Sequence, residues 1–351
     1  MGELGGYLDL QVNGYGGIDF QDDSLTAEDL HNACAALRAD GTEQFLATIV
    51  TEKIEVMDRR LRRVVALREQ DPLVREMIPA IHIEGPFISP IAGYRGAHPV
   101  DAIRPAEVDL MKRLLDAADG LAKLVTLAPE YDPGLRTTKM LSQMGIRISA
   151  GHTNASLEQL QEAIDSGLSM FTHLGNGCPM QLHRHDNIVQ RALSLCDELV
   201  LMFIADGAHV AFPALGNYLR MAGIDRCIVV TDAVAPAGKG AGRFKFGRWD
   251  ILIGEDLVVR APDGSHLVGS ALSMPQAMRR LIECVGLTRE QALKLTVHNP
   301  RMALGYDCAC ELCQVKTESA VGLSAPEVQV LIPRGRSSRR PQPLPGGGAT
   351  L

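Results

Sequence analysis

Three residues whose side chains commonly bind divalent metals each follow a short apolar run in this sequence. Glu84 lies in HIEGPF, His152 in AGHTNAS and His173 in THLGNG. One carboxylate and two imidazoles are a frequent ligand set for a catalytic ion, with water as the fourth ligand. Such an ion lowers the pKa of that water toward neutrality. Any one of these residues alone fits a structural role better, but the three together predict a metal site.

A further acid, Asp232, follows another apolar run in TDAVAPAG. Its carboxylate could take a proton from the activated water and return it to a leaving group, or it could cap a helix or order the loop. In the first apolar run, Asp9, Gln11 and Asn13 share one face because strand side chains alternate. Amides bind transition metals less well than imidazoles, so we expect Gln11 and Asn13 to orient the site. One ion per chain is therefore predicted.

The apolar runs are predicted strands, and segments of helical period separate them. The expected strands are 7–12, 44–48, 78–83, 124–127, 147–150, 170–172, 200–204 and 227–231. The expected helices between them include 26–39, 54–69, 105–118, 157–166 and 213–221. Such βα repeats predict an α/β fold, a (β/α)8 TIM-type barrel. The C-terminal ends of barrel strands carry the chemistry, and the candidate metal ligands and Asp232 follow strands at that end.

Beyond the eighth strand the pattern changes twice. Residues 244–272 are expected to form short strands and turns, and 275–302 a helix interrupted near Gly286. From residue 307 the periodicity stops, and the end of the chain is rich in Pro, Gly, Ser and Arg. We therefore expect a barrel domain over 1–306 and a disordered tail over 307–351. The cysteines of DCACELC lack a clear fourth ligand and are interpreted as accidental rather than as a metal site.

Composition excludes several classes of protein. The chain is 46% hydrophobic and 22% charged, which is typical of a globular protein with a large core. With 35 Lys and Arg against 42 Asp and Glu, it has no overall positive field, so nucleic acid is not expected as a main partner. The start has no basic or apolar leader, and the strongest apolar run, 199–205, is far below the roughly 18 residues of a membrane span. We expect a cytoplasmic protein that does not contact a membrane and whose five other cysteines are buried free thiols.

Ten motifs follow one another between about Tyr7 and Gly305: DLQVNGYGG, HIEGPF, GAHP, TLAPE, SAGHTNAS, THLGNG, ADGAHV, VTDAVAPAG, GSALSM and HNPRMALG. In this order they resemble the N-acetylglucosamine-6-phosphate deacetylases of the amidohydrolase superfamily. The resemblance implies that Glu84, His152 and His173 are the metal ligands and Asp232 the catalytic acid and base. Other amidohydrolases have HxH on the first strand, and the amides found there in this sequence imply the single-metal branch of the family.

The resemblance also implies roles for five substrate-binding residues. His98, in GAHP, matches a histidine that polarises the acetyl carbonyl and stabilises the oxyanion. Asn176 and Gly177 match a pair that contacts the substrate through an amide side chain and the backbone. Arg184 matches the phosphate-binding arginine and His209 a histidine near the phosphate. Arginine and histidine donors suit a doubly charged phosphate.

The implied reaction is hydrolysis of N-acetylglucosamine 6-phosphate to glucosamine 6-phosphate and acetate. The resemblance also implies one divalent ion per chain, which we expect to be zinc, with iron, cobalt or manganese as alternatives. It implies a homodimer as well. The family also has a small β-sandwich, which is largely missing here, because six residues precede Tyr7 and the segment after Tyr306 differs. Two alternatives therefore stay open: a related amidohydrolase with another amide substrate, and an inactive sugar-phosphate-binding fragment.

Overall fold

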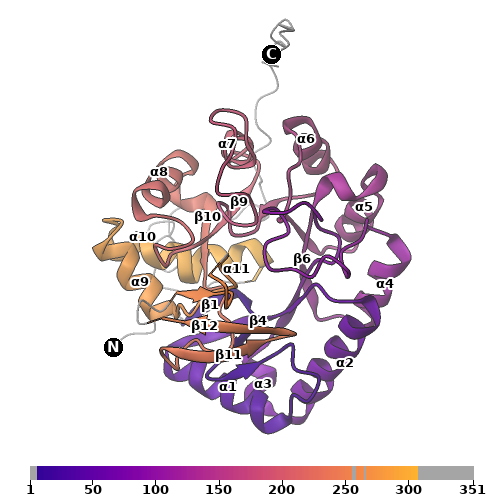
Figure 1. The fold of residues 1–351 in the computed structure, drawn as a ribbon, viewed down its shortest axis with the longest axis vertical. Helices are drawn as coiled ribbons and strands as arrows, with labels where there is room; N and C mark the ends of the chain where they lie inside the picture. Colours follow the sequence, from indigo (N-terminus) through magenta and orange to yellow (C-terminus); the bar gives the residue numbers. More distant parts are fainter. Residues whose placement is uncertain (1–5, 255–257, 265, 307–351) are drawn as a thin grey trace, which may run out of the picture.

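The centre of the molecule is a closed parallel sheet. The computed structural model describes residues 6–254, 258–264 and 266–306. Its main strands are β1 (Tyr7–Val12), β4 (Thr42–Val50), β5 (Ala80–Glu84), β6 (Ala122–Leu127), β7 (Arg147–Ala150), β8 (Met170–Phe171), β9 (Val200–Ile204) and β10 (Cys227–Val230), paired in that order. A parallel bridge between Val12 and Ala233 joins the end of β1 to the segment that follows β10, and Asn13 N donates to Ala233 O at 2.7 Å. The predicted (β/α)8 barrel is therefore confirmed (Figure 1).

Helices surround this sheet as a ring (Figure 1). They are α1 (Ala27–Ala39), α2 (Ile54–Gln70), α3 (Pro72–Met77), α4 (Val108–Ala117), α5 (Arg136–Gln143), α6 (Leu157–Asp165), α7 (Ile188–Ser194), α8 (Phe212–Ala222), α9 (Met274–Glu283), α10 (Arg289–Leu293) and α11 (Asn299–Leu304). Capping boxes at Thr26 and Ser156 fix the starts of α1 and α6, because each hydroxyl accepts from the backbone three residues on. No helix in the described part of the chain has the length and apolar character needed to cross a bilayer.

A layer of hydrogen-bonded polar side chains lies inside the barrel. His82 Nε2 lies 2.8 Å from Thr126 Oγ1, which is 2.7 Å from Thr172 Oγ1, and Ser149 Oγ is 2.6 Å from the same Thr172 oxygen. These side chains are fully buried, and burial lowers the pKa of His82 to about 4. A neutral imidazole and hydroxyls can satisfy one another without placing a charge in the core. This layer supports the strand ends, since His82 precedes Glu84 on the same face of β5.

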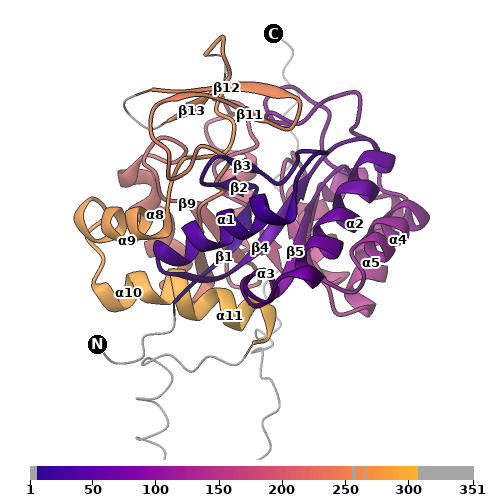
Figure 2. The same ribbon diagram turned by 90° about the horizontal axis from the view of Figure 1, so that it is seen from below.

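A small antiparallel sheet covers one end of the barrel, and α10 and α11 lie at the other (Figure 2). It consists of β11 (Gly242–Phe246), β12 (Trp249–Ile253) and β13 (Val259–Arg260). Its apolar side forms a second core with Val234, and Ala97 packs against that core. Arg248 fastens the sheet to the barrel by donating to Glu52 and Asp101. The sheet thus packs directly on loops that follow β5 and β10.

The sequence prediction of the elements is largely confirmed. All eight barrel strands occur, with ends within two residues of those expected, and short strands and an interrupted helical stretch follow them. The hairpin of β2 (Gly14–Tyr15) and β3 (Ile18–Asp19) was not predicted, and neither were α3, α5 and α7. Within the described residues no β-sandwich forms. The predicted tail, 307–351 with its three cysteines, lies outside the described residues, so the domain boundary stays a prediction.

One detail of the cysteine prediction is wrong. Cys34 and Cys227 are buried and Cys178 and Cys196 are partly buried, but Cys284 is exposed. Cys284 lies at the end of α9, where the chain turns at Gly286 toward α10, so its side chain faces solvent rather than the barrel. Periodicity in the sequence placed it in a helix but did not locate the end of that helix.

Candidate active site

The candidate site lies where four strands end. Glu84 is the last residue of β5, and His152, His173 and Asp232 each follow their strand by two residues. The last three have left-handed backbones, with φ of 51°, 32° and 51°, and they are three of the five described non-glycine residues with positive φ. Such a conformation costs on the order of 1–3 kcal/mol and persists only where neighbours enforce it. Backbone strain is thus concentrated at the residues that sequence motifs identify as functional.

Glu84 is the centre of a buried group of imidazoles. Its Oε1 lies 3.0 Å from His173 Nε2 and 3.4 Å from His152 Nε2. His98 Nε2 lies 3.2 Å from His152 Nε2, and the ligand atoms of Glu84, His98 and His152 are all within 4.8 Å of one another. The structure therefore brings the three predicted ligands together and places His98, expected to polarise the carbonyl, beside them.

The protonation of His152 shows that this group fits a metal ion. Its Nδ1 lies 2.9 Å from the carbonyl oxygen of Tyr94, so Nδ1 carries the hydrogen and donates it. The Nε2 lone pair then faces Glu84 Oε1, itself an acceptor. Two lone pairs on atoms 3.4 Å apart repel each other unless a cation or a proton lies between them. A histidine that donates its other ring N–H to a backbone carbonyl is also the usual arrangement of a metal ligand.

The charges of the cluster agree with this chemistry. Burial alone would raise the pKa of Glu84, but the contacts with His152 and His173 lower it well below its usual value. Burial, followed by the neighbouring His152, lowers the pKa of His98 to about 3. The site therefore combines an ionised carboxylate with a neutral imidazole, and both can act as Lewis bases.

Asp232 is joined to the cluster by two amides. Gln11 Nε2 donates to both oxygens of Glu84 at 3.1 Å and to Asp232 Oδ1 at 3.0 Å, and Asn13 Nδ2 donates to the same Oδ1 at 2.7 Å. Burial, and next the charge of Glu84, raise the pKa of Asp232 to about 6. Within the described part of the chain, no hydrogen bond engages Oδ2. One carboxylate oxygen is thus held in place while the other remains available for proton transfer.

Two predicted substrate residues, Asn176 and Gly177, lie beside the cluster. Asn176 Nδ2 donates to the carbonyl oxygen of His173 at 3.2 Å. Gly177 has a φ of +59°, and a Cβ there would lie 2.9 Å from His152 Nδ1. Glycine is required at this position both by its backbone and by the close approach of the imidazole.

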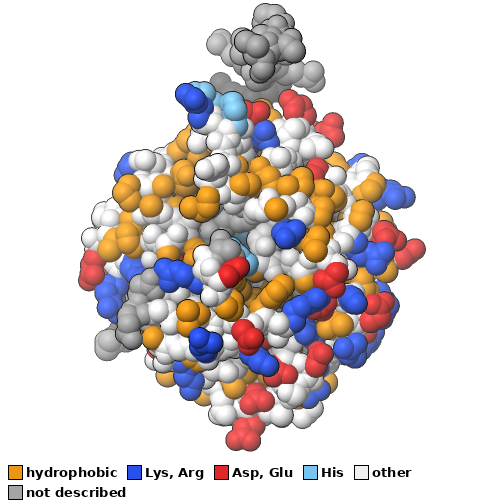
Figure 3. All heavy atoms as spheres, viewed as in Figure 1, with side chains coloured by type: hydrophobic (Ala, Val, Ile, Leu, Met, Phe, Trp, Pro, Cys, Tyr) orange, Lys and Arg blue, Asp and Glu red, His pale blue; other side chains and the backbone are white. Residues whose placement is uncertain are grey.

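The two predicted phosphate-binding residues differ in their surroundings. His209 Nδ1 lies 2.6 Å from Asp206 Oδ2, and among the described residues no hydrogen bond engages its Nε2. Arg184 is exposed in the segment before α7, and in the described part of the chain no hydrogen bond or ion pair joins it to the cluster. Figure 3 shows a histidine in a hollow near the middle of the face, while other histidine and basic side chains lie at its edge beside α7. The structure does not bring Arg184 to the Glu84 cluster.

Sequence reasoning missed three residues that support the site. The carbonyl of Tyr94 orients His152, but a backbone acceptor leaves no signal in the sequence. Asp206, three residues before His209 in ADGAHV, was visible as a local partner. Glu130, the last residue of TLAPE, accepts from Thr153 Oγ1 and from Asn154 N at 2.7 Å and so fixes the loop after His152.

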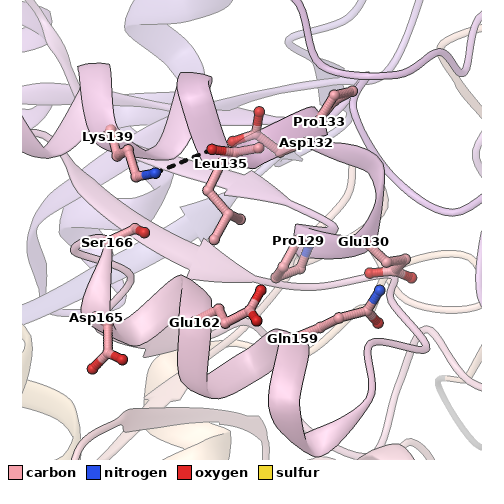
Figure 4. Close-up of a pocket in the computed structure, with 11 residues that line it drawn as sticks. Pro129, Glu130, Asp132, Pro133, Leu135, Lys139, Gln159, Glu162, Asp165 and Ser166 are labelled. Atoms are coloured by element: carbon pink, nitrogen blue, oxygen red, sulfur yellow. Dashed lines mark hydrogen bonds between the residues drawn. The ribbon is translucent and has the colours of Figure 1, made fainter.

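A pocket of about 530 Å³ lies behind this loop on the outer wall of the barrel. Pro129, Glu130 and Leu135 form one side of it, and Gln159 and Glu162 of α6 form another (Figure 4). The pocket contains none of the predicted site residues. Its relation to the site is through Glu130 alone, so it is not the candidate active site.

Comparison with known proteins points to one activity class. No protein-family model matches the sequence. The chain is 32% identical over 306 residues to the N-acetylglucosamine-6-phosphate deacetylase of Lysinibacillus sphaericus, covering 86% of this chain and 76% of that protein. It is 33% identical over 311 residues to the enzyme of that name from Bacillus subtilis, covering 86% and 75%. It is also 31% identical over 308 residues to the N-acetylgalactosamine-6-phosphate deacetylase of Escherichia coli O157:H7, covering 86% and 78%.

Solved structures agree with these relatives. A mutant N-acetyl-D-glucosamine-6-phosphate deacetylase from Mycobacterium smegmatis, in complex with N-acetyl-D-glucosamine-6-phosphate, superposes with a TM-score of 0.79. It is 29% identical, and the match covers 87% of this chain and 78% of that one. The Thermotoga maritima N-acetylglucosamine-6-phosphate deacetylase gives a TM-score of 0.75 at 28% identity, covering 86% and 78%. The barrel and the strand-end cluster therefore occur in a chain that is similar to these deacetylases over most of its length.

Proposed function

This chain belongs to the N-acetylglucosamine-6-phosphate deacetylase family of amidohydrolases, and we propose that it hydrolyses N-acetylglucosamine 6-phosphate to glucosamine 6-phosphate and acetate. The observation that carries the proposal is the buried cluster of Glu84, His152 and His173, joined by Gln11 to Asp232. An ionisable carboxylate beside a metal-ligand set can supply the proton transfer and the Lewis acid of metal-dependent amide hydrolysis.

Glu84, His152 and His173 would hold one divalent ion, with zinc expected and iron, cobalt or manganese as alternatives. The His152 Nε2 lone pair that faces Glu84 Oε1 supports this assignment. When bound, the ion acts as a Lewis acid that polarises the amide carbonyl and acidifies water. Gln11 holds both oxygens of Glu84, so that its carboxylate keeps one orientation toward the imidazoles.

Asp232 acts as the general base and then the general acid. Its free Oδ2 takes a proton from the water whose oxygen bonds to the acetyl carbon. The carbon–nitrogen bond then breaks, and Asp232 returns the proton to the departing amine. His98, kept neutral by its surroundings, donates its ring N–H to the carbonyl oxygen as negative charge develops there.

We further propose that Arg184 and His209 bind the 6-phosphate. Asp206 orients the ring of His209 through Nδ1, and among the described residues no hydrogen bond engages its Nε2. The exposed Arg184 would bind the phosphate of a substrate held by a partner subunit. The enzyme would then be a cytoplasmic homodimer in which one protomer completes the phosphate site of its partner. Asn176 and the backbone of Gly177 would contact the sugar.

One relative, the N-acetylgalactosamine-6-phosphate deacetylase at 31% identity, supports N-acetylgalactosamine 6-phosphate as a second candidate substrate. Both substrates share the acetamide and the 6-phosphate and differ in the configuration at C4. None of the roles assigned above distinguishes the two configurations at C4, so the second sugar is also a candidate substrate.

Acetate release from the zinc-loaded, purified protein tests the proposal. We expect turnover of N-acetylglucosamine 6-phosphate and little turnover of unphosphorylated N-acetylglucosamine. Faster turnover of N-acetylgalactosamine 6-phosphate would assign the second sugar, and equal turnover of the unphosphorylated sugar would favour a different amide hydrolase. Metal binding without acetate release from any of these compounds would indicate an inactive sugar-phosphate-binding protein.

A further inference from the structure

The backbone around Asp232 is held from one side by a buried carboxylate that the proposed reaction does not use. Asp9 on β1 is 1% exposed. Its Oδ1 accepts from Thr231 N at 3.2 Å, and its Oδ2 accepts from Thr231 Oγ1 at 2.5 Å. Oδ1 also accepts from Gln11 N at 3.2 Å. Asp9 therefore binds both donors of the residue that immediately precedes Asp232.

Ser270 holds the same turn from the other side. Its Oγ donates to the carbonyl oxygen of Thr231, and its backbone N–H donates to the carbonyl oxygen of Asp232 at 2.9 Å. Val234 N in turn donates to Ser270 O at 3.0 Å. The preceding Gly269 has a φ of +58°, and a Cβ there would lie 2.5 Å from Val234 Cγ1. The GSALSM motif thus places a serine against the two peptide groups that flank Asp232.

These contacts enclose a strained residue. The φ of Asp232 is +51°, a conformation that L-residues avoid unless the surroundings impose it. Its carboxylate is also fixed at Oδ1 by Gln11 and Asn13. Those two amides can meet Oδ1 only while the backbone keeps this turn. Releasing the turn would let the carboxylate rotate away from both amides.

We infer that Asp9 and Ser270 are positioning residues for Asp232, which hold its backbone in the left-handed turn so that Oδ1 meets the amides and Oδ2 stays free. The inference rests on the proposed function, because it assigns the turn to the residue that moves the proton. It also gives a role to two motif residues that contact neither the candidate ligands nor the predicted phosphate-binding side chains.

Two variants and a matched control test the inference. Ser270→Ala removes the hydroxyl that donates to the carbonyl oxygen of Thr231. Thr231→Val removes the hydroxyl that donates to Asp9 and keeps the volume of the side chain. The control is Thr138→Val on α5, because Thr138 Oγ1 donates to the buried Asp132 at 2.8 Å and its backbone N–H donates to the same carboxylate at 2.7 Å. The control thus removes an equivalent buried contact away from the site.

We expect Ser270→Ala and Thr231→Val to lower kcat by about 10- to 100-fold, since small misplacement of a catalytic group has effects of that size. KM and metal content should stay near those of the parent, and Thr138→Val should keep the parental kcat. If Ser270→Ala does not fold, the isosteric Thr231→Val decides the question alone. A kcat for Thr231→Val equal to that of Thr138→Val would overturn the inference.

Combination with Asp232→Asn separates the two proposals. If Ser270 acts through Asp232, adding Ser270→Ala to Asp232→Asn should cause no further loss of kcat. The same fold loss in both backgrounds would overturn the positioning role while leaving the proposed function intact. Parental turnover by Asp232→Asn alone would overturn the proposed function, and this inference with it.

Discussion

The strand-end cluster and the loop before α7 serve the same proposed substrate but are built differently. In the cluster, Glu84 is 2% exposed and His173 3%, and each contacts groups from other strands. In the loop, His183 and Arg184 are exposed, and the contacts are local, such as Asp186 N donating to His183 Nδ1 at 2.9 Å. The barrel organises the first region, whereas the hydrogen bonds of His183 in the second are made within its own turn.

This difference indicates how the two regions would divide the work. Groups that a rigid barrel holds in place need no reorganisation during the reaction, so they should determine kcat. A side chain on an exposed loop loses conformational freedom when it binds an anion, so it should determine KM and depend on what packs beside it. Substitutions in the two regions should therefore separate kcat from KM.

The largest effect is expected from Glu84→Gln, which removes the only carboxylate among the three candidate ligands. The parent should keep one divalent ion per chain after dialysis, and the variant should keep little metal and no detectable turnover. Metal analysis of the dialysed proteins checks this. Two stoichiometric ions in the parent would contradict the single-metal assignment, and a fully loaded variant would contradict the role of Glu84.

The next largest effect is expected from Asp232→Asn. Loss of the proton shuttle should lower kcat by about 10²- to 10⁴-fold, whereas KM and metal content should change little. Steady-state acetate release, measured with the metal content of the same sample, separates the two quantities. Loss of metal in this variant would show that Asp232 belongs to the ligand set instead.

Arg184→Ala tests the other region. Loss of a charge-assisted contact of about 1.5–3 kcal/mol should raise KM by about 10- to 100-fold with little change in kcat. If Arg184 acts across a subunit boundary, mixed dimers of Arg184→Ala and Asp232→Asn should recover part of the activity, because one of the two sites is then complete. No recovery in verified mixed dimers would show that each chain binds its own phosphate.

The smallest effect is expected from Gly177→Ala, at the junction of the two regions. The alanine must keep a left-handed backbone, and its Cβ crowds His152. Together these should destabilise the fold by about 1–3 kcal/mol. Thermal unfolding of the metal-loaded protein measures this. Gly145→Ala is a matched control, because it also has a positive φ but no atom within 4 Å of its Cβ position. An equal loss in both variants would show that the contact with His152 has no cost of its own.

Much of the scaffold was predictable because its signals are local. Apolar runs of four to six residues and the capping box at Thr26 depend on neighbours in the chain, and the predicted strands and helices follow them. The short helices α3, α5 and α7 were missed because six to eight residues carry little periodicity. Cys284 was misassigned for a similar reason, since exposure at the end of a helix depends on how the next helix packs.

By itself, the sequence determined which side chains stand at the ends of which strands, since alternation along a strand and the order of βα units are properties of the chain. Only the tertiary structure decided which of these groups meet and in what conformation. Gln11 and Glu84 are 73 residues apart, and Asp9 and Thr231 are 222 residues apart. The left-handed turns at His152, His173 and Asp232 are strained locally and persist because those distant contacts hold them. The residue types therefore come from the sequence, and the closure of the barrel converts them into a site.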